Sequence, residues 1–283
     1  MIIWLASYPK SGNTWVRSFI SSLLYSNDGT NDFSKLENIK QFPVRSQFQN
    51  FIDDLQDIKQ VYQNWSIVQN YLNLDNKIKF IKTHHVNCKI DNFKFTDDTN
   101  SIGVIYIVRD PRNVACSVKN HFSLENFEEV KEFIFREHNW LGIITNKKLK
   151  PLDNKIPTLI SSWKTNYLSW KNKTKNYLLI KYEDLIKDPH TEFSKISKYL
   201  ENHLNTKFDQ KKIKRTIETC SFKNLQNLEM EGKFEESTID KNNKSVRFFH
   251  LGPDNDWKKI LDKKIADEIT AKFEPEMKEL GYL

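Results

Sequence analysis

The chain is poor in the residues that cross-link or sharply bend a polypeptide. Its 283 residues include 3 cysteines, 7 glycines and 8 prolines. The cysteines, Cys88, Cys116 and Cys220, are odd in number, lie far apart and form no Cys-x-x-Cys pair, so we expect reduced thiols rather than a disulfide framework. No apolar run approaches the roughly 20 residues of a membrane-spanning helix, and the early Tyr8-Pro9 turn leaves no room for a signal peptide. We therefore expect a globular, cytoplasmic protein.

Acidic residues are also scarce relative to basic ones. Lys and Arg total 44, whereas Asp and Glu total 37, which gives a formal net charge of +7. This excess indicates an anionic partner without naming it, because nucleic acid, a nucleotide or plain solubility would each account for it. The basic residues form no dense tail, and a nucleic-acid surface needs a clustered cationic stripe with interleaved aromatics. We therefore expect neither nucleic acid nor a membrane as the partner.

Aromatic residues, in contrast, are abundant. They make up 13% of the chain, which excludes a largely disordered polymer. A chain of this length buries about three quarters of its unfolded surface in a single core. Because the sequence shows no internal repeat, no low-complexity linker and no Pro/Gly-rich joint, we expect one domain over residues 1–283.

Short apolar runs alternate with helical patterns along the chain. This alternation predicts an α/β fold with a parallel sheet. The stretch 231–246 is polar and loop-like, and is either a mobile cover over a site or an ordinary exposed loop. The predicted strands are 2–7, 78–82, 103–108 and 177–182, the predicted helices are 14–25, 113–121 and 191–200, and helical spacing also runs through 34–74 and 124–172.

The polar turn after the first strand is the most informative segment. It contains Tyr8-Pro-Lys-Ser-Gly-Asn-Thr-Trp15, and it leads from the carboxyl edge of the expected sheet into a helix, where free N–H groups favour a phosphate. Lys10 adds a cation. The turn is not a Walker A loop, because its lysine precedes the glycine and no acidic partner marks a Mg²⁺ site. The alternative is a simple polar helix cap, for which Asn13 or Thr14 would suffice.

The full string resembles the 5′-phosphosulfate-binding loop of the cytosolic-type sulfotransferases, which use 3′-phosphoadenylyl sulfate (PAPS). That family usually has threonine where this chain has Asn13. Further family elements match in the same order, and the chain is therefore identified as a member of this family. The matching elements are Lys82-Thr-His84, the run from Arg109 to Ser117, Tyr182-Glu-Asp-Leu and Ser221-Phe222.

The resemblance implies a three-layer α/β domain related to the P-loop nucleotide kinases, with a central parallel sheet of about five strands. It also implies transfer of a sulfonate from PAPS to a hydroxyl or amine of a small-molecule acceptor, with adenosine 3′,5′-bisphosphate as product and no metal. A monomer or a weak homodimer is expected, because the C-terminal segment lacks the core of the family's dimer motif. The alternative is a kinase-like phosphotransferase, which would need a true P-loop and Mg²⁺.

Three residues resemble the family's catalytic groups. Lys10 would stabilise charge on the leaving phosphate oxygen, Lys82 would hold the sulfonate oxygens, and His84 would act as general base. The neighbouring His85 is the competing histidine, but alternation along a strand places only His84 on the face of Lys82. A structural donor is the alternative role for a histidine at a strand end. A metal pair of His85 and Cys88 lacks further ligands at zinc spacing.

The donor is expected to bind at both of its anionic ends. Arg109 and Ser117 would grip the 3′-phosphate, since a guanidinium matches phosphate in shape and charge. Trp15, Tyr182 and Phe222 would surround the adenine, although buried aromatics are more often plain core. The complete predicted binding set is Lys10, Ser11, Gly12, Asn13, Thr14, Trp15, Arg109, Ser117, Tyr182, Phe222, Arg247, His250, Leu251 and Gly252.

The family's last motif, Arg-Lys-Gly-x-x-Gly-x-Trp-Lys, is incomplete in this chain. His250 and Leu251 stand where the arginine and lysine are expected, and Asn255 replaces the second glycine. Two cations of the 3′-phosphate site are therefore missing. The residues that are kept are Gly252, Trp257 and Lys258.

Nearby basic residues offer a replacement for the missing charge. We expect Arg247, aided by Arg112, to supply it. Lys241 and Lys244 lie in the neighbouring polar stretch.

Overall fold

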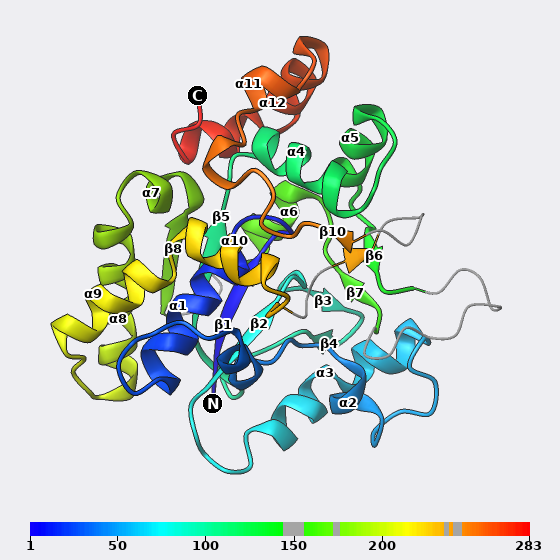
Figure 1. The fold of residues 1–283 in the computed structure, drawn as a ribbon. Coiled ribbons are helices and arrows are strands. Elements are labelled where there is room, and N and C mark those ends of the chain that lie inside the picture. The colour runs from blue at the N-terminus through cyan, green and yellow to red at the C-terminus, as the bar shows by residue number, and fades with distance from the viewer. Residues whose placement is uncertain (144–155, 172–175, 235–237, 240–244) are drawn as a thin grey trace. The chain divides into compact units, whose positions relative to one another are not determined.

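A computed structural model describes residues 1–143, 156–171, 176–234, 238–239 and 245–283 of the chain (Figure 1). The chain forms two compact units. The first comprises Met1–Tyr8, Ile39–Tyr106 and Arg136–Leu179, and the second comprises Pro9–Asn38, Ile107–Phe135 and Ile180–Leu283.

The central sheet has four strands in the described part of the chain. They are β1 (Ile2–Ser7), β2 (Lys79–Thr83), β5 (Ser101–Val108) and β8 (Tyr177–Lys181), in the order β2-β1-β5-β8. Strands β1 and β2 are parallel, with Ala6 opposite Thr83. All six residues of β1 are buried, as expected for a parallel strand covered on both faces. The predicted parallel α/β sheet is confirmed, with four strands where about five were expected.

In the first unit, Trp4 of β1 lies within a cluster of aromatic rings. The ring centroid of Trp4 lies 5.4 Å from that of Phe95, 5.7 Å from Phe42 and 5.9 Å from Trp170. The elements of this unit beside the sheet are α2 (Arg45–Phe48), α3 (Ile58–Leu72), α6 (Trp163–Trp170), the antiparallel pair β3 (Lys89–Ile90) and β4 (Phe93–Lys94), and the antiparallel pair β6 (Trp140–Leu141) and β7 (Thr158–Leu159).

The second unit is mainly helical. Phe19 and Phe193 stack in its core, with their ring centroids 4.2 Å apart. Its elements are α1 (Asn13–Tyr25), η1 (Phe33–Asn38), α4 (Pro111–His121), α5 (Phe127–Phe135), α7 (Tyr182–Lys187), α8 (Pro189–Leu204), α9 (Gln210–Thr219), α10 (Phe222–Met230), β9 (Thr238–Ile239) paired with β10 (Ser245–Val246), η2 (Gly252–Asp254), α11 (Trp257–Ile260) and α12 (Lys263–Glu279).

Two helices of this unit begin at an Asp-Pro sequence. Asp110 and Asp188 are the N-caps of α4 and α8, and each side chain accepts a hydrogen bond from a backbone N–H two or three residues later. Proline is favoured directly after such a cap, because its missing N–H has no partner in the helix. The sequence thus fixes the start of α4, which lies next to the expected site.

Several predicted elements differ from the structure in detail. Strand β8 ends at Lys181 because Tyr182 begins α7, a helix that the sequence patterns did not predict. The helical spacing through 34–74 and 124–172 corresponds to helices only in part. In the stretch 231–246 the described residues include the strand pair β9 and β10, whereas Lys241 and Lys244 lie outside the described residues.

The remaining global predictions concern thiols, membrane helices and domain count. Cys88, Cys116 and Cys220 form no disulfide bond, as predicted. In the described ranges, no helix combines the length and the apolar character needed to cross a membrane. The assignment of residues 1–283 to one domain stays a prediction.

Candidate functional site

Helix α1 begins at a glycine. Its N-cap residue is Gly12, which makes no side-chain cap hydrogen bond, so the N-cap is neither Asn13 nor Thr14, which lie inside the helix. The first N–H groups of a helix have no partner within the helix, and they carry the positive end of its dipole. This start of α1 therefore has the features of an anion site.

Only glycine fits at position 12. Gly12 has φ of 99°, a left-handed conformation that is costly for other residues. A Cβ atom at this position would also lie 2.4 Å from Cδ2 of Tyr182. The ring of Tyr182 thus packs directly under the turn, and backbone conformation and close packing both require glycine.

Two buried donors in the same turn point to a polar ligand. Ser11 is fully buried and Trp15 is 7% exposed. Neither Ser11 Oγ nor Trp15 Nε1 has a hydrogen-bond partner among the described residues. A buried donor without a partner costs about 1–3 kcal/mol of folding free energy, so the arrangement fits a site where a ligand supplies the acceptors.

Arg109 brings several predicted residues together. Its Nη1 donates to the carbonyl oxygen of Lys10 and to Oγ of Ser117, each at 3.2 Å, and its guanidinium lies 4.1 Å from the ring centroid of Tyr182. The ring of Trp15 packs edge-on against Tyr182 at 5.8 Å. Burial raises the pKa of the Tyr182 hydroxyl, with Arg109 acting in the opposite direction, so this phenol stays neutral. Five predicted residues therefore form one cationic cluster in the second unit.

Lys10 lies against an aromatic ring that the sequence analysis did not single out. Its Nζ is 3.8 Å from the ring centroid of Phe248, a cation–π contact. The backbone N–H groups of Phe248 and Phe249 both donate to the carboxylate of Glu229, at 2.6 and 2.9 Å. Glu229 on α10 thus fixes the turn that carries Phe248. The adjacent pair of phenylalanines directly before His250 was the available signal.

The glycine of the incomplete motif is also defined by packing. Gly252 has φ of 53°, and a Cβ atom there would lie 2.2 Å from Cζ of Phe222. Phe222 is thereby placed against Gly252 of this motif. Trp15 and Tyr182, the two other aromatic residues predicted to surround the adenine, contact each other instead. His250 and Arg247 are exposed and Leu251 is half-buried, and Asn120 Nδ2 donates to the carbonyl oxygen of Arg247 at 3.4 Å.

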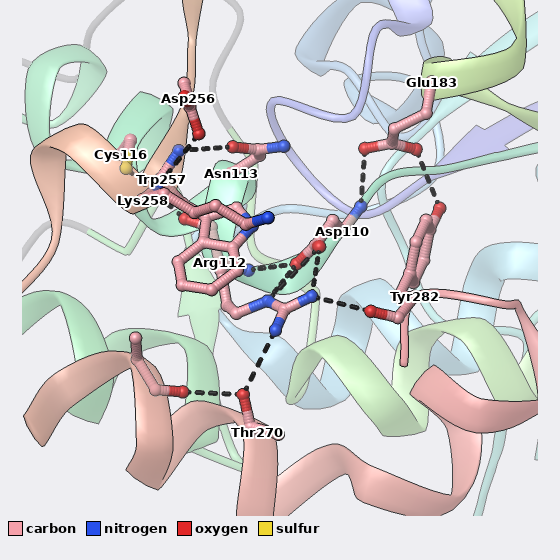
Figure 2. A network of polar contacts seen from close by, with 11 residues as sticks. Asp110, Arg112, Asn113, Cys116, Glu183, Asp256, Trp257, Lys258, Thr270 and Tyr282 are labelled. Atoms are coloured by element: carbon pink, nitrogen blue, oxygen red, sulfur yellow. Dashed lines mark hydrogen bonds and ion pairs between the residues drawn. The ribbon is translucent and has the colours of Figure 1, made fainter. Parts of the chain in front are cut away.

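Arg112 has a structural role instead of the predicted one beside Arg247. Figure 2 shows its guanidinium bonded to the carboxylate of Asp110, with Nη2 2.7 Å from Oδ2, and to the carbonyl oxygen of Tyr282 at 2.9 Å. The same guanidinium lies 4.1 Å from the ring centroid of Trp257. Its donors are directed into the fold, which argues against Arg112 as a phosphate ligand.

Beside this pair, the carboxylate of Glu183 on α7 links the start of α4 to Tyr282 near the C-terminus (Figure 2). It accepts the N–H of Asp110 at 3.0 Å and the hydroxyl of Tyr282 at 2.9 Å. Burial raises the pKa of Glu183.

In the first unit, His84 is held in a defined orientation. Its Nδ1 lies 2.9 Å from the carbonyl oxygen of Ser7 and 3.2 Å from Ser7 Oγ. Because a carbonyl oxygen only accepts, Nδ1 carries the hydrogen, and in the neutral ring the lone pair that binds a proton is on Nε2. Lys82, two residues earlier on β2, is 7% exposed and pairs with Leu5 in the strand register.

The neighbouring His85 differs sharply from His84. It is fully buried, and its ring stacks on Phe95 with centroids 4.2 Å apart and an interplanar angle of 3°. Burial lowers the pKa of His85 to about 3. A histidine that cannot take up a proton at neutral pH is a poor base, so the structure favours His84 in that role.

Asn166 on α6 supports the backbone at His84, and the sequence analysis did not identify it. Its Nδ2 donates to the carbonyl oxygens of His84, at 2.9 Å, and of Ile160, at 2.8 Å, while its Oδ1 accepts the hydroxyl of Tyr106 at 2.8 Å. Asn166 is fully buried. A polar residue within a pattern of buried aromatic residues in this helix was the signal that could have found it.

An α/β fold in which the first strand is followed in sequence by a helix with a cationic, glycine-capped start is typical of proteins that bind phosphate groups. The family model for the sulfotransferase domain matches residues 2–281, so the chain belongs to the sulfotransferase family. The identification made from the sequence motifs is confirmed.

Relatives and a solved structure agree with this assignment. Luciferin sulfotransferase of Photinus pyralis is 28% identical over 80% of this chain and 56% of its own length, so the match spans little more than half of that protein. Flavonol 3-sulfotransferase of Flaveria bidentis is 22% identical over 99% of this chain and 83% of its own length. The crystal structure of mouse sulfotransferase SULT7A1 complexed with PAP has a TM-score of 0.56 at 20% identity, covering 96% of this chain and 83% of that one. This likeness confirms the fold.

Proposed function

We propose that the chain transfers the sulfonate group of PAPS to a hydroxyl or amine of a small-molecule acceptor and releases adenosine 3′,5′-bisphosphate (PAP). The observation that carries the proposal is the start of α1, where Gly12 is the N-cap and the buried donors of Ser11 and Trp15 have no acceptor among the described residues. The PAP named with the mouse structure, and the luciferin and flavonol named for relatives, support a nucleotide donor and small acceptors. When bound, PAPS supplies an activated sulfonate on its 5′-phosphate.

The second unit contains the residues that would hold this donor. The first turn of α1 and Lys10 would bind the 5′-phosphosulfate, because backbone N–H groups and an ammonium complement its charge. Arg109 and Ser117 would bind the 3′-phosphate through charge-assisted and neutral hydrogen bonds. Arg247 is exposed three residues before His250, and we assign to it the cation that the motif lacks.

His84 is the proposed base. With Nδ1–H bonded to the carbonyl oxygen of Ser7, its Nε2 would take the proton of the acceptor hydroxyl as the new bond to sulfur forms. Asn166 holds the backbone of His84 and so preserves this orientation. The acceptor proton thus ends on the histidine, and Lys10 stabilises the charge that develops on the departing phosphate oxygen.

We also propose a cytoplasmic location for the chain. Several relatives are called cytosolic sulfotransferases, which supports the proposed cytoplasmic location. A monomer or a weak homodimer remains our expectation for the assembly.

A transfer assay tests the proposal. The protein is incubated with ³⁵S-labelled PAPS and a panel of phenols, aliphatic alcohols and amines. We expect transfer to at least one acceptor class, a loss of about 10²-fold or more in rate for His84→Gln and of about 10²- to 10³-fold for Lys10→Ala. His190→Gln, an exposed histidine at the start of α8, serves as the matched control. Transfer of phosphate from Mg²⁺-ATP instead, or no binding of PAP, would overturn the proposal.

The role of Arg247 is tested by comparing two ligands. Arg247→Ala is expected to weaken PAP about 10-fold or more, as for a lost hydrogen bond to a charged group, and to leave the affinity for adenosine 5′-phosphate unchanged. Lys214→Ala, which removes an exposed cation on α9, should change neither affinity. Equal effects of the two substitutions on PAP binding would refute the assignment.

A further inference from the structure

Asn255, which stands where the family motif has its second glycine, is hydrogen-bonded to the first turns of α4. Its Nδ2 donates to the carbonyl oxygen of Asn113 at 2.9 Å, and Oδ1 of Asn113 accepts the N–H of Trp257 at 3.0 Å (Figure 2 shows the latter contact). Arg112 covers the ring of Trp257 from the same helix. Asn255 is 6% exposed. The side chain of Asn255 and the backbone of Trp257 are therefore both hydrogen-bonded to Asn113 of α4.

The orientation of the Asn255 amide follows from chemistry. The carbonyl oxygen of Asn113 can only accept, so the atom of Asn255 that faces it is the nitrogen. The same nitrogen lies 3.1 Å from Oγ of Ser117 and directs its second hydrogen there. Oδ1 of Asn255 is buried and has no hydrogen-bond partner within the described ranges. The amide is thus used for its two donors, both directed at α4.

Ser117 consequently receives two donors. Its Oγ accepts from Nδ2 of Asn255 at 3.1 Å and from Nη1 of Arg109 at 3.2 Å. A hydroxyl oxygen has two lone pairs and one hydrogen. With both lone pairs occupied, the hydroxyl hydrogen has to point away from Arg109 and Asn255, and Ser117 is only partly buried. The hydroxyl hydrogen is therefore directed away from both donors.

We propose that Asn255 is a positioning residue for the 3′-phosphate of the donor, which acts by holding the Ser117 hydroxyl as a donor to a phosphate oxygen. The inference rests on the proposed function. It gives this chain a contribution that a glycine at position 255 cannot make, in a motif where His250 and Leu251 replace two cations. Neutral, oriented hydrogen-bond donors thus replace part of the phosphate binding that the two missing cations would provide.

Binding of two nucleotides to a set of variants tests this role. Affinities for PAP and for adenosine 5′-phosphate, which lacks the 3′-phosphate, are measured for the wild type, Asn255→Gly, Ser117→Ala and the double variant. We expect Asn255→Gly to weaken PAP about 3- to 10-fold, as for one neutral hydrogen bond, and to leave adenosine 5′-phosphate unchanged. In the Ser117→Ala background, Asn255→Gly should have no further effect, because the group it orients is gone. Asn205→Gly, an exposed and remote asparagine at the end of α8, is the matched control.

Two results would overturn the inference. Equal loss of affinity for both nucleotides would mean that Asn255 only supports the fold. Losses that add in the double variant would mean that Asn255 does not act through Ser117. The proposed function fails in a different way, by absence of PAP binding to the wild-type protein, so the two failures are distinguishable.

Discussion

Replacing Gly12 with alanine is expected to destabilise the protein strongly, for two separable reasons. The first is the backbone, because Gly12 has φ of 99° and an L-residue in a left-handed conformation costs about 1–2 kcal/mol. The second is packing, because the new Cβ would lie 2.4 Å from Cδ2 of the buried Tyr182 ring. Overpacking of this kind costs about 1–3 kcal/mol. The free energy of unfolding should therefore fall by about 2–5 kcal/mol.

The chain contains a control that isolates the backbone cost. Gly232, after helix α10, also has a left-handed conformation, with φ of 72°, but no atom lies within 4 Å of where its Cβ would be. Gly232→Ala should therefore lower the free energy of unfolding by only about 1–2 kcal/mol. The difference between the two variants measures the clash with Tyr182.

Urea unfolding at neutral pH provides the measurement. Both variants should shift the midpoint with little change in slope, since the surface exposed on unfolding is the same. Equal losses for Gly12→Ala and Gly232→Ala would show that Tyr182 does not pack under the turn, and the argument that places Arg109 on its ring would fail with it. A neutral effect of Gly12→Ala would refute the left-handed N-cap itself.

Three further predictions concern the surroundings of the site, and the first has a control substitution elsewhere on the surface. Asp110→Ala leaves Arg112 buried without its carboxylate and should lower the free energy of unfolding by about 3–5 kcal/mol. Arg215→Gln, which breaks a half-exposed ion pair with Asp28, should lower it by less than about 1 kcal/mol. Similar losses for the two substitutions would contradict the burial of the first pair. His85 has a pKa near 6.5 in the unfolded chain and about 3 in the folded one, so the unfolded chain takes up the extra proton. The free energy of unfolding should therefore fall by about 1.6 kcal/mol from pH 6.5 to 5. His85→Phe should remove that acid-side loss in urea titrations, and an unchanged pH profile would count against it. Burial raises the pKa of Glu183, so its contribution to the free energy of unfolding is full below about pH 4.5 and declines as the pH rises through its folded pKa. Glu183→Gln should make this decline shallower. A steeper decline would contradict a raised pKa for Glu183.

Local patterns in the sequence predicted the elements that carry the proposed donor site. The apolar run at residues 2–7 is β1, and the apolar periodicity starting at residue 14 is α1, displaced by one residue. These succeeded because a buried parallel strand and an amphipathic helix each leave a periodicity of their own. The strand predicted at 177–182 is one residue longer than β8, because Tyr182 continues the apolar pattern. The position of Tyr182 is set by Arg109 and Gly12, which are distant in sequence.

Contacts between distant segments explain what the sequence analysis missed. The ring of His84 is hydrogen-bonded to Ser7, which lies 77 residues earlier in the sequence and follows the paired residues Ala6 and Thr83 of β1 and β2. Arg112 was expected to serve a phosphate, because nothing in its neighbourhood along the chain reveals Tyr282 or Trp257. Side-chain chemistry could be assigned from the motif, but which donors the fold itself uses depends on tertiary packing.

The side chain of Arg109 is already held in one position before any ligand binds. Tyr182 lies against one face and Nη1 is bonded to Lys10 and Ser117, so the many rotamers of a free arginine are restricted when the chain folds. Ordering such a side chain at the moment of association costs about 0.5–1.5 kcal/mol. An anion that meets Arg109 avoids this entropic penalty, and its binding should show a correspondingly less unfavourable entropy than binding to a mobile surface arginine.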